Sequence, residues 1–129
     1  QVMIDVHEKM YKDNNDPQVH SLIRNEDVSL NAVKHVINLA KKNDGRVHIC
    51  HMSTKGEAHT MAKYHNKQIT CEVTPHHLFL HTDDYVKLQN FVKVNPPIRS
   101  EVHVKALWEA ISNGVVDMIV TDRTLVPQV

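Results

Sequence analysis

Three polar groups follow short apolar segments in this chain, and their side chains could carry out chemistry. His51 follows "RVHIC", the segment Glu72-Val73-Thr74-Pro75 follows "ITC", and Asp122 follows "MIVT". Imidazole and carboxylate are common ligands of zinc, and a carboxylate can also transfer protons. Taken alone, a histidine at a strand end is more often a packing residue, and an aspartate there is more often a helix cap. What matters is whether the fold brings these groups together.

The apolar pattern alternates between the periods of strands and helices. Strands are expected at 46–51, 68–74 and 115–121, and the segment 91–97 is expected to be extended. Helices are expected over 28–43, over 100–114 and after Thr54, where Thr54 and Glu57 have the spacing of a capping box. Alternating strands and helices with short connections indicate a parallel sheet. Ligand sites in such folds lie at the carboxyl ends of the strands, so the three groups are expected at one edge.

The two long helices carry finer expectations. The helix over 28–43 is expected to begin at a cap formed by Asp27 or Ser29. The helix over 100–114 is expected to begin at Ser100 and to end at Asn113-Gly114. Residues 80–90 read as a short helix or turn, and residues 1–27 as an early helix followed by a loop. The side chains expected to face the core are Leu30, Val33, Val36, Ile37 and Ala40 on the first helix and Val104, Leu107, Trp108 and Ile111 on the second.

Composition excludes several classes of protein. The 129 residues contain 15 Lys and Arg and 15 Asp and Glu, a formal net charge of zero, which argues against a nucleic-acid or membrane-surface partner. No apolar run approaches the roughly 20 residues needed to cross a bilayer. Cys50 and Cys71 form no disulfide framework, so a reduced, cytoplasmic setting is expected. The 11 histidines favour a metal site without identifying its ligands.

Four motifs carry a resemblance to a known family. The segments "VHICHMSTKGEAH", "TCEVTPHHLFL", "VNPPIRS" and "DMIVTD" resemble, in this order and at these spacings, segments of the dihydroorotases, and the match covers roughly residues 20–122. Dihydroorotases are zinc-dependent cyclic amidohydrolases of pyrimidine biosynthesis. Allantoinases and dihydropyrimidinases are similar around "EVTP", but they tend to lack the asparagine before Pro-Pro and the "PHHL" pair.

The resemblance implies a (β/α)₈ TIM barrel with two zinc ions at its carboxyl mouth. Such a barrel needs about 250 residues, so this chain is expected to supply only the last three to four β/α units. The family's first-strand His-x-His, its metal-bridging carboxylate, often a carboxylated lysine, and its fifth-strand histidine have no counterpart here. The isolated chain is therefore expected to be incomplete and inactive.

The resemblance also assigns roles to three residues. His51 matches a metal ligand, and Asp122 matches the last-strand aspartate, which binds one metal and moves a proton from the bridging hydroxide to the leaving nitrogen. Asn95 matches a residue that hydrogen-bonds the substrate ring, although a turn before proline is an equally good reading. The reaction implied is the reversible ring opening of dihydroorotate to N-carbamoyl-aspartate.

Other candidates are expected to play lesser parts. Adjacent residues on an extended segment point to opposite faces, so His76-His77 is expected to be structural. His48 and Cys50 are expected to face the helices, on the strand face opposite to His51. Cys50 and Glu72, at neighbouring strand ends, could bind an additional zinc ion. Arg99 is expected to pair on the surface.

The sequence departs from the family after Asp122. The family continues "TDHAPH", whereas this chain reads "TDRTLVPQV", with Arg123 and Val126 in place of the two histidines. The chain is expected to be one partial-barrel domain over 1–129, with a lead-in at 1–27, β/α units over 28–122 and an atypical tail at 123–129. Three readings stay open: a partial dihydroorotase; a hydantoinase- or allantoinase-like enzyme; and a non-catalytic half-barrel that forms homo-oligomers or binds a transcarbamoylase, since open sheet edges favour association.

Overall fold

A three-stranded parallel sheet lies at the centre of the molecule. The computed structural model describes residues 1–122, so the predicted tail at 123–129 lies outside the described residues. Strands β1 (Val47–Ile49), β2 (Ile69–Val73) and β3 (Met118–Ile119) pair in the order β1-β2-β3. Both pairings are parallel, with His48 opposite Thr70 and Glu72 opposite Met118. The predicted parallel β/α arrangement is therefore confirmed.

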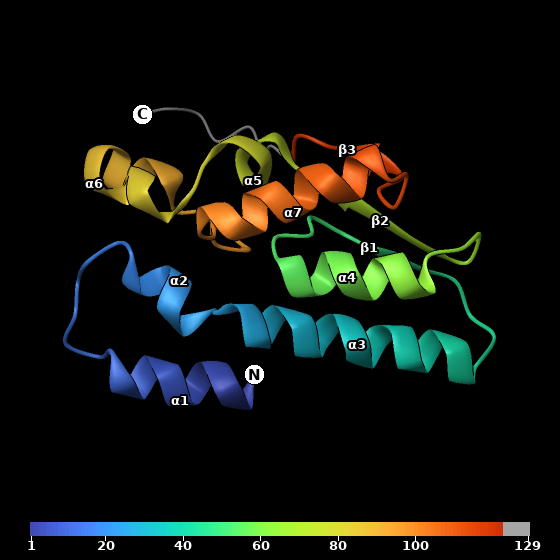
Figure 1. Ribbon diagram of the computed structural model, residues 1–129. Coiled ribbons are helices and arrows are strands. Elements are labelled where there is room, and N and C mark those ends of the chain that lie inside the picture. The colour runs from blue at the N-terminus through green and yellow to red at the C-terminus, as the bar shows by residue number, and fades with distance from the viewer. Residues whose placement is uncertain (123–129) are drawn as a thin grey trace.

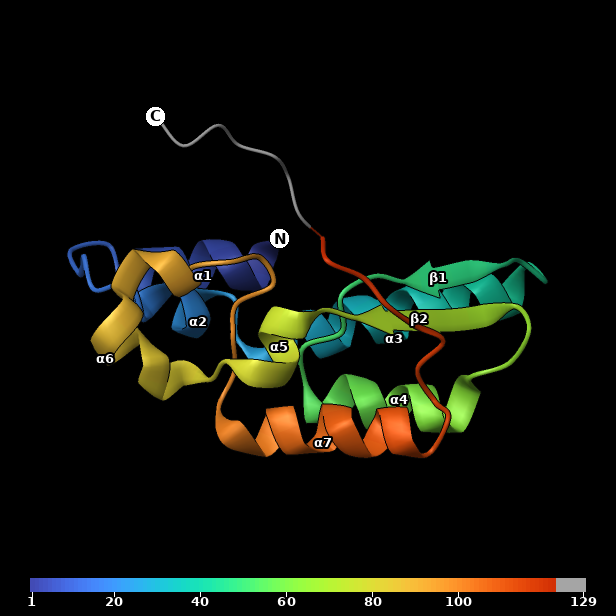
Figure 2. The same ribbon diagram turned by 90° about the horizontal axis from the view of Figure 1, so that it is seen from above.

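Three long helices cover one face of this sheet, as Figures 1 and 2 show for α3 (Glu26–Lys42), α4 (Lys55–Tyr64) and α7 (Glu101–Ser112). The shorter elements are α1 (Val2–Met10), α2 (Val19–Ile23), α5 (Pro75–Phe79), α6 (Tyr85–Leu88) and the 3₁₀ turns η1 (Thr82–Asp84) and η2 (Gln89–Val92). No helix within residues 1–122 has both the length and the apolar character needed to cross a membrane.

The core lies between the sheet and these helices. Because side chains alternate along a strand, the helix-facing positions are Ile49 on β1 and Ile69, Cys71 and Val73 on β2, and all four are buried. They pack with Val33 and Ile37 of α3, Met61 of α4 and Leu107 of α7. The opposite face carries His48, Thr70 and Glu72, which are only partly buried.

The structure corrects the predicted direction of His48 and Cys50. Both residues alternate with Ile49, and Ile49 is the residue that packs against the helices. His48 therefore points to the other face, where its ring bonds Thr70 and Glu72. The prediction was wrong because the pattern "VHIC" gives the alternation but does not say which set of residues meets the helices.

The helix starts are fixed by side-chain caps. Thr54 and Glu57 form the predicted capping box of α4, with each side chain accepting a hydrogen bond from the other's backbone N–H. The cap of α3 is Asn25, whose Oδ1 accepts the N–H of Val28 at 3.2 Å, and not Asp27 or Ser29. Glu26 and Asp27 lie instead in the first turn, where their negative charges favour the helix dipole.

Other expectations about single segments were wrong in part. Phe91 and Val92 belong to η2 and are not extended, and α2 lies in a region expected to be a loop. Val36 and Trp108 are 38% and 40% exposed, although both were expected inside. Trp108 lies at the edge of the core, where its Nε1–H donates to the carbonyl of Leu78 at 2.9 Å and its ring meets Phe79 edge-on.

Strand β3 is shorter and more exposed than the predicted strand 115–121. Its Met118 and Ile119 are 48% and 54% exposed, because within the described chain only β2 pairs with it. Asp117, which directly precedes β3, holds the start of the strand in place. One of its carboxylate oxygens accepts the N–H of Cys71 at 2.8 Å, and the other lies 3.0 Å from His65 Nε2. Burial opposes ionisation of Asp117, but the bonds from His65 and Cys71 outweigh it and lower its pKa.

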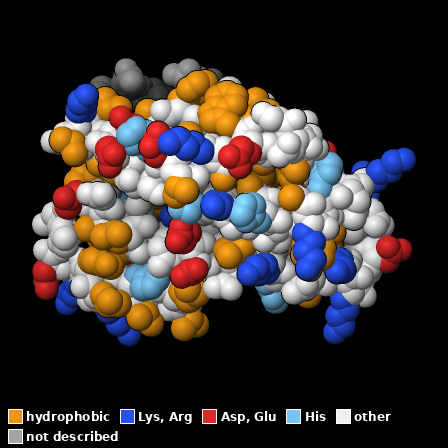
Figure 3. All heavy atoms as spheres, in the orientation of Figure 1, with side chains coloured by type: hydrophobic (Ala, Val, Ile, Leu, Met, Phe, Trp, Pro, Cys, Tyr) orange, Lys and Arg blue, Asp and Glu red, His pale blue; other side chains and the backbone are white. Residues whose placement is uncertain are grey.

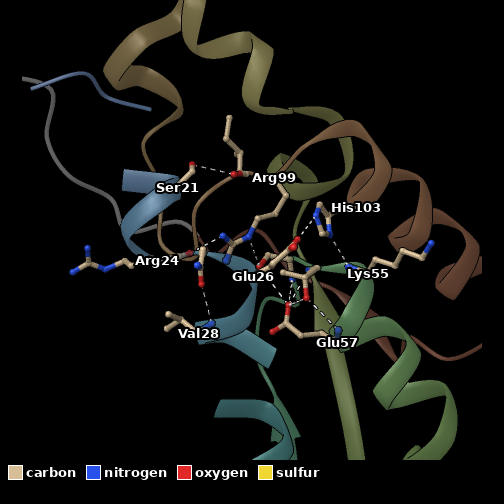
Figure 4. Close-up of polar contacts among 12 residues, drawn as sticks. Ser21, Arg24, Glu26, Val28, Lys55, Glu57, Arg99 and His103 are labelled. Carbon is tan, nitrogen blue, oxygen red and sulfur yellow. Dashed lines mark hydrogen bonds and ion pairs between the residues drawn. The ribbon is translucent and has the colours of Figure 1, made fainter. Parts of the chain in front are cut away.

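A buried polar cluster joins the N-terminal helices to the β/α units (Figure 4). Arg99 is 6% exposed, and not on the surface as expected. Its guanidinium donates to the carbonyl of Arg24 at 2.6 Å and to Ser53 Oγ at 3.2 Å. Glu57, 2% exposed, accepts the Ser29 hydroxyl at 2.6 Å and the Thr54 N–H at 2.8 Å. These bonds set the spacing between α3, α4 and the segment before α7.

Candidate functional site

The carboxyl ends of the three strands lie at one edge of the sheet, as expected for parallel neighbours. Figure 2 shows β1 and β2 running in the same direction. His51 stands two residues beyond β1, Thr74 one residue beyond β2 and Asp122 three residues beyond β3. Segments that are far apart in the sequence thus present an imidazole and a carboxylate at the same edge. This is the position that ligand sites take in parallel α/β folds.

His51 is held in an unusual conformation at this edge. Its φ angle is 39°, in the left-handed region that residues other than glycine rarely adopt. The N–H of His51 donates to Glu72 Oε1 at 3.3 Å, and the N–H of Met52 donates to the Glu72 carbonyl at 2.9 Å, which ties the loop to β2. Its ring Nδ1 is buried and meets no hydrogen-bond partner within residues 1–122. A buried acceptor of this kind fits a metal ligand.

Asp122 also has a left-handed backbone, with φ of 46°, and its side chain is exposed. The pKa of the Cys50 thiol is raised most by burial, then by the charge of Glu72, and then by the charge of Asp122. Burial lowers the pKa of His76, and the charge of Asp122 opposes this shift. His51 also acts on the pKa of His76. The charges of Asp122 and His51 therefore both act on His76. Left-handed backbone at Asp122 and His51 is typical of functional positions.

His76 and His77 belong to helix α5, and not to an extended segment as expected. Their ring centroids lie 4.5 Å apart. His77 is structural, because its two ring nitrogens bond Thr74 Oγ1 at 2.7 Å and the Pro96 carbonyl at 2.9 Å. The Nε2 of His76 is buried without a partner among the described residues. The sequence prediction placed the pair on an extended segment, although Pro75 at a helix start would have placed it on a helix.

Asn95 is the third residue to which the resemblance assigns a role. Its side chain is exposed in the segment before α7 and borders a hollow of about 180 Å³ that Ile4, Ala32 and Arg99 also line. Within residues 1–122 no hydrogen bond joins its side chain to His51 or Asp122. The hollow opens between α1, α3 and the loop that contains Asn95.

Cys50 and Glu72 do approach each other, and His48 joins them. One ligand atom from each of the three residues lies within 4.8 Å of the others. His48 Nε2 is 2.9 Å from Glu72 Oε2, and His48 Nδ1 is 2.8 Å from Thr70 Oγ1. The cluster lies on the sheet face away from the helices.

The donors at the carboxyl edge fit a divalent transition metal but do not complete its shell. Imidazole and carboxylate are the ligands that zinc takes in catalytic sites, which use three protein ligands for each ion. His51 and Asp122 supply one of each, and His76 supplies a further free nitrogen. Two ions would need more donors than these three residues supply.

Sequence comparison gives this edge a context. No protein-family model matches the chain. A dihydroorotase from Methanosarcina acetivorans is 38% identical over 113 residues, and one from Streptomyces coelicolor is 49% identical over 88 residues. These alignments cover 81% and 66% of this chain. An allantoinase from Salmonella newport is 36% identical over 98 residues, 74% of the chain.

The chain spans only part of these relatives. It covers 24% of the Methanosarcina enzyme, 20% of the Streptomyces enzyme and 22% of the allantoinase. Among solved structures, a D-hydantoinase superposes with a TM-score of 0.85 at 25% identity, over 95% of this chain and 28% of that protein. The L-hydantoinase of Arthrobacter aurescens, at 24% identity and a TM-score of 0.88, shares the fold, with the same coverage.

The fold prediction is confirmed: the three parallel strands and their helices are a portion of an amidohydrolase TIM barrel. The identity to dihydroorotases, together with the match to hydantoinase structures, defines the family. This chain is a dihydroorotase-like part of the catalytic barrel of the cyclic amidohydrolases.

Proposed function

We propose that this chain forms part of a dihydroorotase, a zinc-dependent hydrolase that reversibly opens the ring of dihydroorotate to N-carbamoyl-aspartate in pyrimidine biosynthesis. The observation that carries the proposal is that His51 and Asp122 both follow strands at the same carboxyl edge of the sheet, in a chain that is 37–49% identical to dihydroorotases. The same chemistry, hydrolysis of a cyclic amide, applies to allantoinases and hydantoinases, so the substrate is the finer part of the proposal.

Three side chains have roles in this reaction. His51 would hold a metal through its free ring nitrogen, and Asp122 would hold a metal and carry a proton to the leaving ring nitrogen. Asn95 hydrogen-bonds the substrate ring, which requires substrate to reach the loop before α7. When bound, zinc supplies Lewis-acid chemistry that activates water near neutral pH. His76, neutral because burial lowers its pKa, can accept a hydrogen bond beside Asp122.

The isolated chain is expected to be inactive. Its donors at the edge do not fill the coordination shell of two metals, and the relatives are four to five times longer than the aligned segment. Catalysis therefore needs the rest of the barrel, on a longer form of this chain or on another chain.

A chimaeric barrel tests the proposal. Residues 1–122 would replace the aligned segment of the Methanosarcina acetivorans dihydroorotase, and turnover of dihydroorotate, allantoin and hydantoin would be measured. Dihydroorotate should be the preferred substrate. Asp122→Asn should lower kcat about 10²- to 10⁴-fold, because a proton carrier is lost. His35→Asn, on the exposed face of α3, is the control and should leave kcat unchanged. Preference for allantoin or hydantoin would contradict the substrate assignment.

A second candidate is a non-catalytic half-barrel that works by self-association. The exposure of Met118 and Ile119 on β3 supports it, because an unpaired apolar edge strand tends to pair with another chain. Turnover by the chimaera together with a monomeric isolated chain would count against this candidate.

A further inference from the structure

Three donors of different chemical type meet on the sheet face away from the helices. They are the imidazole of His48 on β1, the thiol of Cys50 just beyond β1, and the carboxylate of Glu72 on β2. Their ligand atoms lie within 4.8 Å of one another, and none of the three lies in the apolar core. The edge residues His76 and Asp122 are not members of this cluster, although the charge of Asp122 reaches Cys50.

The sheet itself brings these residues together. His48 is in register with Thr70, and Ile49 with Cys71, so Cys50 and Glu72 continue the same parallel pair by one position each. Residues two apart on a strand share a face, which puts His48 and Cys50 on the same side. The approach of the three donors follows from backbone pairing between adjacent strands.

The hydrogen bonds of His48 orient its ring toward Glu72. With Nδ1 bonded to Thr70 Oγ1 at 2.8 Å, Nε2 faces Glu72 Oε2 at 2.9 Å. Two ligands at about 2.0–2.1 Å from a tetrahedral ion lie roughly 3.3 Å apart, so a small outward shift admits a cation between them. A metal-binding histidine usually donates its second ring N–H to an oxygen acceptor, which fixes the ring, and Thr70 Oγ1 is placed to be that acceptor.

We propose that His48, Cys50 and Glu72 bind a zinc ion that is distinct from the metals assigned to His51 and Asp122. Nitrogen, sulfur and oxygen donors together favour zinc over magnesium or calcium, which prefer oxygen alone. Three protein ligands leave a tetrahedral ion one open position. This proposal does not depend on the dihydroorotase activity.

The ion would also act on the carboxyl edge. Glu72 uses its other oxygen, Oε1, to accept the N–H of His51 at 3.3 Å. Zinc on Oε2 fixes the Glu72 carboxylate, and Glu72 in turn fixes the loop that carries His51. The zinc site is therefore a positioning element for the loop after β1.

Cobalt binding to the full 129-residue chain tests the site, because Co²⁺ replaces zinc and gives a thiolate charge-transfer band in the near ultraviolet. The band should appear as Co²⁺ is added and be displaced by zinc. Cys50→Ser should abolish the band, and His48→Ala should weaken Co²⁺ binding at least about tenfold. Cys50 is exposed, so serine there should leave the far-ultraviolet circular dichroism unchanged.

Two control variants separate this site from the edge. Asp122→Asn should keep the cobalt band, and so should His51→Ala, because neither side chain belongs to the three donors. A band that survives Cys50→Ser would assign the thiolate to the buried Cys71 and overturn the proposal, as would the absence of any band in the unmodified chain. Loss of the band in Asp122→Asn or His51→Ala would show that the edge residues belong to the same site, and would also overturn the proposal.

Discussion

His77 is a histidine whose surroundings require the neutral form. Its Nε2–H donates to the Pro96 carbonyl at 2.9 Å, and its Nδ1 accepts the Thr74 hydroxyl at 2.7 Å. Burial lowers the pKa of His77 to about 3. In the unfolded chain the ordinary value of about 6.5 applies. The structural role predicted for the "PHHL" pair is therefore confirmed for His77, and for His76 it stays a prediction.

A pH dependence of stability follows from this histidine. Between about pH 6.5 and 3 the unfolded chain binds a proton at residue 77 that the folded chain does not bind. The stability contribution is fully present above pH 6.5 and falls with pH by up to about 1.4 kcal/mol per unit. Urea unfolding at a series of pH values measures this slope. His77→Gln should reduce it, and His35→Asn should not; equal slopes in both variants would contradict the assignment.

Glu57 gives a second prediction at this scale. Its buried carboxylate accepts bonds from Ser29, Ser53 and Thr54. Glu57→Gln replaces one acceptor oxygen by a donor that faces other donors, and should lower the free energy of unfolding by about 2–3 kcal/mol. Glu109→Gln, exposed on α7, should change it by less than about 0.5 kcal/mol. Denaturant unfolding compares the two; a change below about 1 kcal/mol for Glu57→Gln would refute a structural role for the cluster.

Individual elements could be predicted to the extent that local signals decide them. The Thr54–Glu57 capping box and the strand at "ITCEV" are local, and both were confirmed. The face taken by His48 and the burial of Arg99 depend on which neighbours pack there, so the sequence alone did not give them. Strand β3 fell short of its predicted length because a strand of this type is completed by neighbours on both sides.

Helix α3 allows a direct test of the core. Ile37 is 1% exposed, whereas its neighbour Val36 is 38% exposed. Ile37→Ala should cost about 2–5 kcal/mol of unfolding free energy, because it leaves a cavity beneath the sheet. Val36→Ala should cost less than about 1 kcal/mol, since its side chain lies mostly in water. Thermal or urea unfolding of the two variants measures both losses of unfolding free energy. Equal losses would contradict this packing.

At the scale of the molecule, the chain has a covered sheet face and an open one. Helices α3, α4 and α7 lie over the first (Figure 2). Strand β3 leaves the apolar side chains of Met118 and Ile119 exposed. On the face seen in Figure 3, acidic and basic side chains are interspersed, as the zero net charge suggests. The comparisons account for the open face, because a complete barrel closes it with further strands.

Self-association is therefore expected for the isolated chain. At micromolar concentration, sedimentation should detect species larger than one chain, formed through the β3 edge. Ile119→Lys places a charge on that edge and should shift the population to monomer. Val86→Lys, 82% exposed on α6, is the matched control and should leave the distribution unchanged. An equal shift in both variants would mean that β3 is not the contact.

The zinc content of the chimaeric barrel tests the central claim most directly, because it reports the ligands and not the substrate. In a Cys50→Ser background, which removes the additional site, the barrel should bind two zinc ions. Either His51→Ala or Asp122→Ala in the same background should lower the bound zinc below two. Full retention of both ions in the two variants would contradict the assignment of His51 and Asp122 as metal ligands.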